Sequence, residues 1–324
     1  MPSIIKTAGL AVAGLAAFAS ALPSQSRFFS RSTYEKRQAA PPAAADPAGG
    51  LTDVDILQFA LTLEHLEAAF YQQGFAKFPA AQFQALGATP QQVTDLLGVG
   101  ASEQAHVTFL QSAIAQAGTK PVQPCKYNFK FTDAAGMLGT ASVLESVGVS
   151  AYLGAAPLVK DKSILSAAGS ILTIEARHQT AINIVSQLAG SPGAFDAPLG
   201  PREVFSLAAP FIESCPDGSN LAIKAFPSLA MAPGTKATAL SAGNTLNIQS
   251  DQAQGAQFCG FTNGQIIGGT AFAPFTAGAG CVIPQNLAGI VYVTLTNQAP
   301  LTGKLTEDMI VAGPMVVNLA PGSL

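Results

Sequence analysis

The fold is decided by four stretches: Leu63-Glu64-His65-Leu66-Glu67, Glu103-Gln104-Ala105-His106, Leu144-Glu145-Ser146-Val147 and Glu175-Ala176-Arg177-His178. Each lies near the middle of an apolar segment that is long enough for a helix. In two of them a glutamate and a histidine are three residues apart, which places both side chains on one helix face. Residues 51–190 contain no other glutamate. We therefore expect a four-helix bundle in which these acidic and imidazole groups meet at one level.

Buried carboxylates need a counter-charge, and these helix faces carry no lysine or arginine to supply one. A pair of metal cations is the simplest solution. One glutamate from each of two helices and a Glu-x-x-His from each of two others is the ligand pattern of di-iron and di-manganese carboxylate proteins. The predicted ligands are the single glutamates Glu64 and Glu145, the bridging glutamates Glu103 and Glu175, and the terminal histidines His106 and His178.

The predicted cofactor is two divalent metal ions, iron before manganese, because oxygen and imidazole ligands suit both; zinc is an alternative occupant. A core that keeps these side chains protonated or hydrogen-bonded to one another, without metal, is the competing interpretation. Glu67 is either a fifth ligand or a hydrogen-bond acceptor beside the ligands. Tyr71 and Tyr152 either hydrogen-bond the ligands from outside or are ordinary aromatic core. His65 falls on a different helix face, so we expect a surface or supporting residue rather than a ligand.

The four helices are expected over residues 53–73, 90–117, 133–156 and 161–189, with a long crossover between the second and third. They form a repeat: Glu64 and Tyr71 are echoed by Glu145 and Tyr152, and the two Glu-x-x-His units echo each other. Four glycines in the third helix indicate close approach of a neighbour. A pseudo-twofold axis would then relate two equivalent metal positions.

The chain after residue 192 changes character. Prolines and glycines break up residues 193–220, which we interpret as an irregular connector with a short helix over residues 202–208. Residues 221–324 contain short β-like runs at 222–226, 237–240, 245–248, 258–261, 290–296 and 308–319, the last broken at Gly313-Pro314. These runs predict a small antiparallel β-sandwich. This half has no histidine, and we expect no catalytic site in it.

The N-terminus is typical of a secreted protein. Residues 1–21 combine a lysine, an apolar run and small residues at a cleavage site, which predicts a signal peptide. Residues 22–50 are expected to be a propeptide or linker in which Lys36-Arg37 is either a processing site or a solvated pair. Residues 51–192 would then form the bundle. The protein is expected to be secreted and extracellular, with the cell wall or matrix as its candidate location.

The four cysteines, Cys125, Cys215, Cys259 and Cys281, indicate two disulfides in an oxidising compartment. Three pairings exist, and we favour Cys125 with Cys215 and Cys259 with Cys281, which closes one loop in each part. Charged residues make up only 11% of the 324, with a net charge of -3 and no basic cluster, so we expect no nucleic-acid partner. We expect that no stretch after the N-terminus has the length and apolarity of a membrane span, and we expect no membrane anchor.

The sequence resembles the secreted fungal ferritin-like proteins named for stress response and late sexual development, which are related to plant desiccation-related proteins. The resemblance is carried by residues 53–71, the two Glu-x-x-His units, Ile223-Lys-Ala-Phe-Pro227 and Ile310-Val-Ala-Gly-Pro314. It implies a ferritin-like bundle with a β-rich C-terminal part. One departure is that the extra glutamate, Glu67, lies on the first helix, whereas rubrerythrins carry theirs on the third.

Two functions follow as hypotheses. The first is a di-iron oxidoreductase, similar to ferroxidases or peroxidases, that oxidises Fe(II) or consumes reactive oxygen in stress or development. The second is a non-catalytic cell-wall or matrix protein in which the metal pair staples the bundle and the β-rich part binds a surface partner. The oligomeric state is left open.

Overall fold

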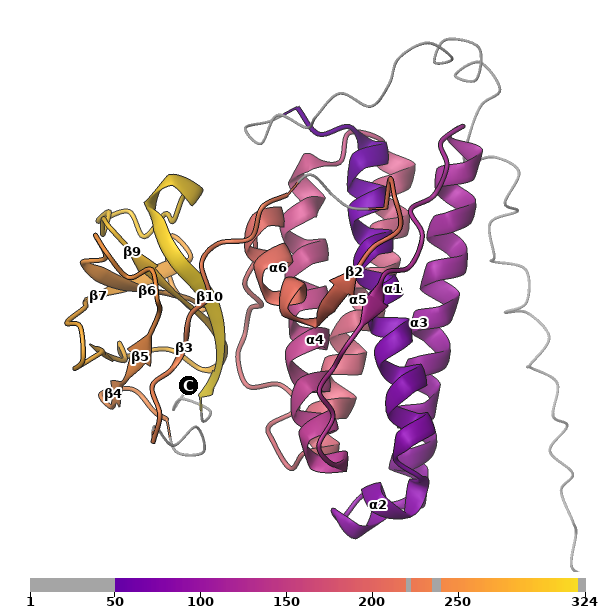
Figure 1. Ribbon diagram of the computed structural model, residues 1–324, viewed down its shortest axis with the longest axis horizontal. Coiled ribbons are helices and arrows are strands. Elements are labelled where there is room, and N and C mark those ends of the chain that lie inside the picture. Colours follow the sequence, from indigo (N-terminus) through magenta and orange to yellow (C-terminus); the bar gives the residue numbers. More distant parts are fainter. Residues whose placement is uncertain (1–49, 220–222, 235–239, 320–324) are drawn as a thin grey trace, which may run out of the picture.

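The computed structural model describes residues 50–219, 223–234 and 240–319. The predicted signal peptide and nearly all of the predicted linker lie outside the described residues. The described chain has a helical part and a β-rich part that lie side by side (Figure 1). This arrangement confirms the predicted class: a helix bundle followed by antiparallel strands in small sheets.

The bundle consists of four long helices: α1 (Asp53–Lys77), α3 (Pro90–Gln116), α4 (Ala134–Ala155) and α5 (Lys162–Val185). Thr52 and Thr89 start α1 and α3 with reciprocal hydrogen bonds to the third helical residue, which satisfy the free N–H groups of the first turn. A short helix, α2 (Ala80–Ala85), closes the end of the bundle between α1 and α3 (Figure 1). α1 packs mainly against α3 and α4 mainly against α5, so the helices pair as the repeat in the sequence does.

Two helix ends differ from the sequence prediction. α1 continues through Gly74 to Lys77, because Gly74 is buried against Met137 rather than ending the helix. A Cβ atom at Gly74 would lie 2.3 Å from Cε of Met137. α5 ends at Val185, earlier than predicted, and Gln187 then turns the chain with a positive φ of 59°. Gly74 therefore marks a close contact within α1 and not its end. The glycine at the expected end of α5 did not mark where that helix stops.

The glycines of α4 are not equivalent. A Cβ atom at Gly154 would lie 2.0 Å from the carbonyl oxygen of Leu199, whose N–H donates to the carbonyl of Ser150 over 3.1 Å. The segment that leaves the bundle is therefore pressed against the α4 backbone. Gly139 has no neighbour within 4 Å of such an atom. The predicted close approach thus holds for part of the helix only.

α4 is also the central apolar helix of the molecule. Among the described residues, the helical stretch Ala134–Leu158 is the one with the length and apolarity of a membrane span. The expectation that no stretch has this length and apolarity was therefore wrong. More than half of its most apolar window is buried inside the protein. Core helices of folded domains have the same composition. α4 packs between α1, α5 and the β-rich part, which accounts for its apolarity.

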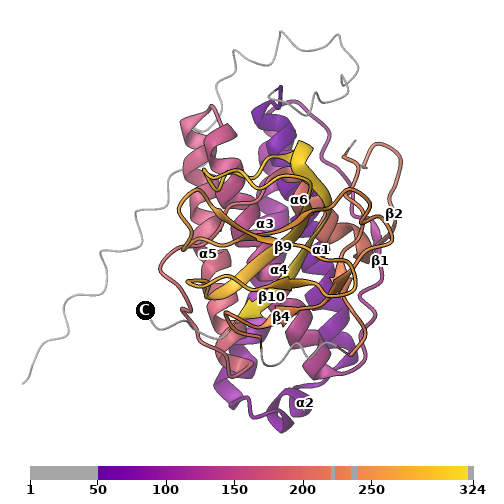
Figure 2. The same cartoon turned by 90° about the vertical axis from the view of Figure 1, so that its left-hand side faces the viewer.

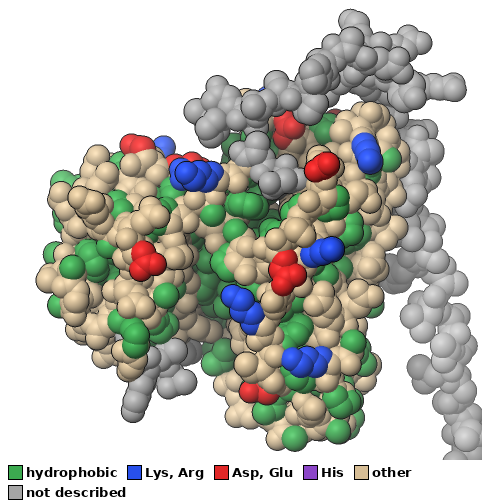
Figure 3. Space-filling view, viewed as in Figure 1, with side chains coloured by type: hydrophobic (Ala, Val, Ile, Leu, Met, Phe, Trp, Pro, Cys, Tyr) green, Lys and Arg blue, Asp and Glu red, His purple; other side chains and the backbone are tan. Residues whose placement is uncertain are grey.

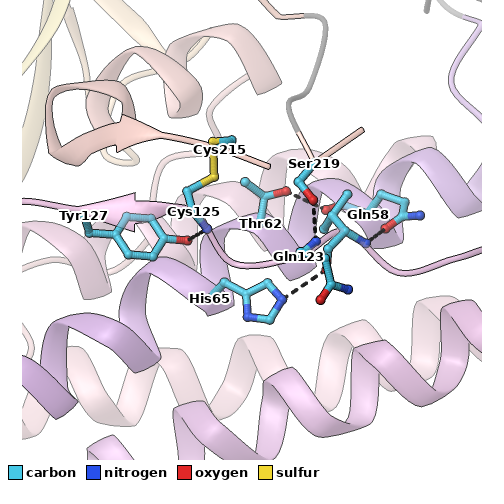
Figure 4. Close-up of a disulfide and its surroundings, with 9 residues drawn as sticks. Gln58, Thr62, His65, Gln123, Cys125, Tyr127, Cys215 and Ser219 are labelled. Atoms are coloured by element: carbon cyan, nitrogen blue, oxygen red, sulfur yellow. Dashed lines mark hydrogen bonds between the residues drawn. A yellow bond between two sulfur atoms is a disulfide. The ribbon is translucent and has the colours of Figure 1, made fainter. Parts of the chain in front are cut away.

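The predicted irregular connector is an ordered bridge. Helix α6 (Pro201–Ala208) packs against α4 and against strand β10 (Ile310–Leu319). Strand β2 (Ile212–Ser214) then pairs with β1 (Lys126–Tyr127) of the crossover. The disulfide Cys125–Cys215 fixes this pair across the outside of α1 (Figure 4). The crossover and the connector therefore support each other, which local sequence did not indicate.

The β-rich part is built on one four-stranded antiparallel sheet in the order β10, β9, β6, β7. Its other strands are β6 (Phe258–Thr262), β7 (Thr270–Pro274) and β9 (Gly289–Thr296). Two small ribbons complete it, pairing β3 (Ala230–Met231) with β5 (Ile248–Gln249) and β4 (Thr245–Leu246) with β8 (Cys281–Val282). The disulfide Cys259–Cys281 links β6 to β8.

The predicted strands were correct for β6 and β9 and incomplete elsewhere. The run at 245–248 is two strands in different ribbons, and β7 lies where no strand was expected. β10 continues through the cis Gly313-Pro314 bond with a shift in register instead of breaking there. Residues 223–226 are not a strand, and the run at 237–240 falls almost wholly outside the described residues.

The two parts of the chain are joined by a polar contact in an apolar interface. Tyr292 of β9 reaches α4, where its hydroxyl donates to the carbonyl of Ser146 over 2.8 Å and lies 2.7 Å from the hydroxyl of Ser150. The sheet lies over the α4 side of the bundle, as the view turned by 90° shows (Figure 2). Charged side chains are sparse on the face seen in Figure 3, as the composition requires.

Glu203, in the first turn of α6, makes stability depend on pH. Its carboxylate accepts the N–H of Gly200 over 3.0 Å, but burial raises the pKa of Glu203 to about 7. The folded protein therefore holds a proton that the unfolded chain loses near pH 4.5, and the free energy of unfolding falls as the pH rises from about 4.5 to 7. Glu203→Gln should leave stability unchanged at pH 4 and increase it by about 2 kcal/mol at pH 8. Denaturant titrations of both proteins at the two pH values check this, and an equal difference at both would contradict it.

Candidate metal centre

Seven ionisable side chains meet near the middle of the four long helices. Glu64 and Glu67 come from α1, Glu103 and His106 from α3, Glu145 from α4, and Glu175 and His178 from α5. The four predicted glutamate ligands have no exposed surface at all, and each histidine is buried. Mid-helix positions reach the same level whichever way a helix runs. The structure therefore brings all six predicted ligands together.

The side chains form two overlapping groups. The first is Glu64, Glu103, His106 and Glu175, and the second is Glu103, Glu145, Glu175 and His178. Within each group one atom of every side chain lies within 4.8 Å of the others. Glu103 and Glu175 belong to both groups, as expected of bridging carboxylates. Each of the two groups could hold a metal ion.

Both histidines turn Nδ1 toward the carboxylates. His106 Nδ1 lies 3.2 Å from oxygens of Glu64, Glu103 and Glu175. His178 Nδ1 lies 2.6 Å from Glu103 Oε1 and 3.3 Å from Glu145 Oε2. The rings are 6.0 Å apart between centroids and nearly parallel, at 30°. Each imidazole thus serves one of the two groups.

Several of these atoms have no hydrogen bond. Among the described residues, six fully buried side-chain oxygens or nitrogens lack a hydrogen-bond partner, and five belong to this cluster: one oxygen of Glu103, one of Glu145, both of Glu175, and Nδ1 of His178. Some lie close to each other, but at angles that make no hydrogen bond. Unpaired buried polar atoms are rare and costly in native proteins. Their convergence on one place makes the cluster a candidate site for a positively charged ligand.

The two tyrosines of the repeat cross over the cluster. Tyr152 of α4 donates to Glu64 Oε1 over 2.5 Å, and Tyr71 of α1 donates to Glu145 Oε1. Each tyrosine therefore holds the single glutamate of the other repeat. These contacts orient the carboxylates from outside, the first of the two roles weighed for Tyr71 and Tyr152.

Ser102 is a neighbour that sequence analysis missed. Its hydroxyl lies 2.6 Å from Nε2 of His178, the ring nitrogen that faces away from the cluster. Such a partner fixes which nitrogen is free to bind a metal. The only sequence signal was a hydroxyl residue immediately before the first Glu-x-x-His.

His65 is buried, not at the surface. Its Nε2 lies 3.2 Å from the carbonyl oxygen of Val122 in the crossover, beneath the Cys125–Cys215 disulfide (Figure 4). Burial lowers the pKa of His65. Of the two positions expected for His65, surface or supporting, the surface is wrong, because the crossover folds over this face of α1. The residue belongs to neither group of the cluster.

Glu67 is a fifth buried carboxylate that belongs to neither group. It lies beside Glu175, over Gly148 of α4: a Cβ atom at Gly148 would be 3.1 Å from Glu67 Oε1 and 2.8 Å from Glu175 Oε2. Gly148 is also the counterpart of Glu67 in the repeat, since Glu145 corresponds to Glu64. The core has room for one such carboxylate, and glycine in the second repeat provides that room.

Burial shifts the protonation of the whole cluster. It raises the pKa of Glu64 to about 7 and raises the pKa values of Glu67, Glu145 and Glu175. For His106, burial opposes, but hydrogen bonds to Glu103 and Glu64 and the nearby carboxylate of Glu175 prevail and raise its pKa to about 12. For Glu103, burial is likewise outweighed by the hydrogen bond from His106 and by the nearby imidazole of His178, which lower its pKa to about 2. A cation entering the site would displace the protons held there.

Among the described residues, no lysine or arginine side chain forms an ion pair with the cluster. Within the described part of the chain, the one ion pair of a lysine or arginine within 4.0 Å joins Arg202 to Glu307, outside the bundle. Five carboxylates thus face two imidazoles. The excess of carboxylates over cationic groups, and the carboxylate oxygens without a hydrogen bond, would both be compensated by a bound cation.

Residues 52–188 match the sequence profile of the ferritin-like domain. The helical part of this chain belongs to the ferritin-like domain family. The matched residues span the four long helices and contain every candidate ligand. The ferritin-like bundle expected from the sequence is thereby confirmed, and the buried Glu and His side chains within it could hold metal ions.

The ferritin-like chain also resembles a curated fungal protein. It is 24% identical over 203 residues to Protein rds1 of Schizosaccharomyces pombe. These residues are 58% of this chain and 50% of the relative, so the chain spans about half the length of the curated relative it matches.

Proposed function

We propose that the ferritin-like domain binds two divalent metal ions, iron or manganese, and that the protein acts outside the cell as an oxidoreductase on Fe(II) or on reactive oxygen. The observation that carries the metal proposal is the convergence of unpaired buried oxygen and nitrogen atoms in two groups that share Glu103 and Glu175. The donors are carboxylate and imidazole, which suit both metals.

Each side chain has a role in this proposal. Glu64 and His106 would complete one metal position, and Glu145 and His178 the other. Tyr152, Tyr71 and Ser102 hold three of these ligands in place through the hydrogen bonds described above. A bound pair of redox-active ions would supply the electron exchange with Fe(II), dioxygen or peroxide that these side chains cannot perform. Glu67, buried beside Glu175, is a group that can hold a proton next to the pair.

Secretion is part of the same proposal. It is supported by the apolar N-terminal run in the sequence and by the two disulfides, Cys125–Cys215 and Cys259–Cys281, which are typical of extracellular proteins. The similarity to Protein rds1 supports placing this protein among the fungal ferritin-like proteins that it resembles in sequence.

The first test is metal content. Full-length protein secreted by a eukaryotic host should carry about two metal ions per chain, because two ligand groups are present. The double variant H106A/H178A should carry none. Inductively coupled plasma mass spectrometry measures both, and circular dichroism shows whether the variant folds. Wild-type protein that stays metal-free when dialysed against Fe(II) or Mn(II) would overturn the proposal.

A structural role for the metal pair is the second candidate. The candidate ligands come from α1, α3, α4 and α5, so ions placed there would join all four helices. Metal-loaded protein that is inert to Fe(II) with dioxygen and to peroxide, yet melts lower after chelation, would favour this role. Turnover with either substrate, lost in H106A/H178A, would favour the oxidoreductase.

A further inference from the structure

The acidic cluster divides the bundle core into two unequal halves. We define the filled half as the end that contains α2 and the open half as the opposite end, where α1 begins and α4 ends. The filled half is packed with phenylalanines in mutual ring contact: Phe70, Phe75, Phe78, Phe83, Phe129 and Phe131. The buried residues of the open half are mainly leucine, isoleucine, valine and alanine, with Tyr152 as their one aromatic ring.

The repeat shows why the halves differ. The offset that relates Glu64 to Glu145 also relates Phe70 to Ala151, Phe75 to Ala156 and Phe78 to Val159. The offset that relates Glu103 to Glu175 relates Leu96 to Ala168. At these four positions a large side chain of the filled half has a smaller counterpart in the open half. The open half therefore lacks side-chain volume at these positions.

The open half contains a cavity. It measures about 810 Å³ and is lined by residues of all four long helices and of the turn after α4, among them Ala151, Ala156, Val159 and Ala168. This volume lies within the usual range for small-molecule sites. Between α3 and α5 its wall includes exposed residues, among them Phe109 and Ser166, so a molecule can enter from solvent there.

The chemistry of the wall selects an uncharged ligand. None of the described residues that line the cavity is lysine, arginine, aspartate or glutamate. Its polar groups are hydroxyls and one amide, several of them exposed, such as Thr108 and Ser170. A charged ligand would lose its water without gaining a partner. Tyr152 is in the wall and donates to Glu64, so the cavity reaches a side chain that holds a candidate metal ligand.

We propose that the open half is a binding site for one uncharged apolar small molecule, held next to Tyr152 and thus beside the candidate metal pair. Its apolar body would take the place that phenylalanines occupy in the filled half. The site would make an apolar organic molecule a substrate or effector of the metal centre, a role that rests on the proposed function. Binding itself depends only on the cavity.

Dye binding to the full-length secreted protein tests this. N-phenyl-1-naphthylamine, an uncharged fluorescent probe, should bind saturably with one molecule per chain. 1-Dodecanol should displace it, and dodecanoate of equal length should not, because the wall offers no charge partner. Ala151→Phe, which restores the aromatic residue of the other repeat, should weaken dye binding about tenfold or more by filling the cavity. Ala81→Phe adds the same volume on the exposed face of α2 and should bind as wild type.

If Ala151→Phe does not fold, Ala168→Leu is used in its place. It is a smaller change that introduces the residue found at the equivalent position of the other repeat, Leu96. Folded Ala151→Phe or Ala168→Leu protein that binds the dye as tightly as wild type would overturn the proposal, as would equal displacement by dodecanoate. A dimer in size-exclusion chromatography with no dye binding would instead assign the opening to a second copy of the chain. Metal analysis of the same samples separates the two proposals: dye binding without metal retains the ligand site alone, and metal without dye binding retains the metal centre alone.

Discussion

Glu175→Gln should remove the bound metal and at the same time stabilise the metal-free protein. Glu175 belongs to both ligand groups, and both of its oxygens are buried without a hydrogen bond. Gln has nearly the same shape but offers one neutral oxygen, so it cannot bridge two cations as a carboxylate does. Metal content should fall from about two per chain to fewer than about one.

The stability effect has the opposite sign because Glu175 is costly without a cation. Burial raises the pKa of Glu175, and the charges of Glu103 and Glu64 raise it further. Replacing it by a neutral amide relieves that cost, and we expect an increase of roughly 2 kcal/mol in the unfolding free energy of the metal-free protein. Metal should stabilise the wild type by about 4 kcal/mol at a thousandfold excess over Kd, and the variant hardly at all.

Thermal unfolding with and without chelator, combined with metal analysis, measures both effects. Glu213→Gln is the matched control, because Glu213 is exposed on β2 and remote from the cluster. It should change neither metal content nor the response to chelator. A Glu175→Gln protein that retains two metals would exclude Glu175 as a bridging ligand. A variant that loses metal and is also less stable in chelator would show that the carboxylate has an undetected partner.

Gly154→Ala should be the most destabilising small substitution in the bundle. The new Cβ atom would lie 2.0 Å from the carbonyl oxygen of Leu199, which is backbone and cannot rotate away. The segment would have to leave α4 and break the hydrogen bond from the N–H of Leu199 to Ser150. We expect a loss of at least about 3 kcal/mol, which is roughly 6–10 °C in Tm for a protein of this size.

The same substitution elsewhere in α4 supplies the control. Gly139 is exposed, and a Cβ atom there meets nothing within 4 Å. Gly139→Ala should therefore raise stability by up to about 1 kcal/mol through helix propensity alone. Calorimetry of the two variants compares them directly. Equal effects at both positions would mean that the contact between Leu199 and α4 does not contribute to the folded state.

Local sequence was sufficient for the bundle because its signals are strong and repeated. Glutamate is so scarce in residues 51–190 that each mid-helix carboxylate marks a buried face, and threonine caps mark where α1 and α3 begin. The same reasoning was weak in the β-rich part. β7 has little alternation of polar and apolar residues, and the two-residue ribbons depend on partners far along the chain.

The sequence by itself determined the helices, the repeat and the set of side chains that could hold a metal, because helical periodicity fixes which residues share a face. Only the tertiary structure decided that the crossover buries His65, that Ser102 meets His178, and that Gly148 makes room for Glu67. It also decided that one half of the core is filled and the other open. These features depend on distances between separate helices, and such distances are set by packing rather than by any local pattern.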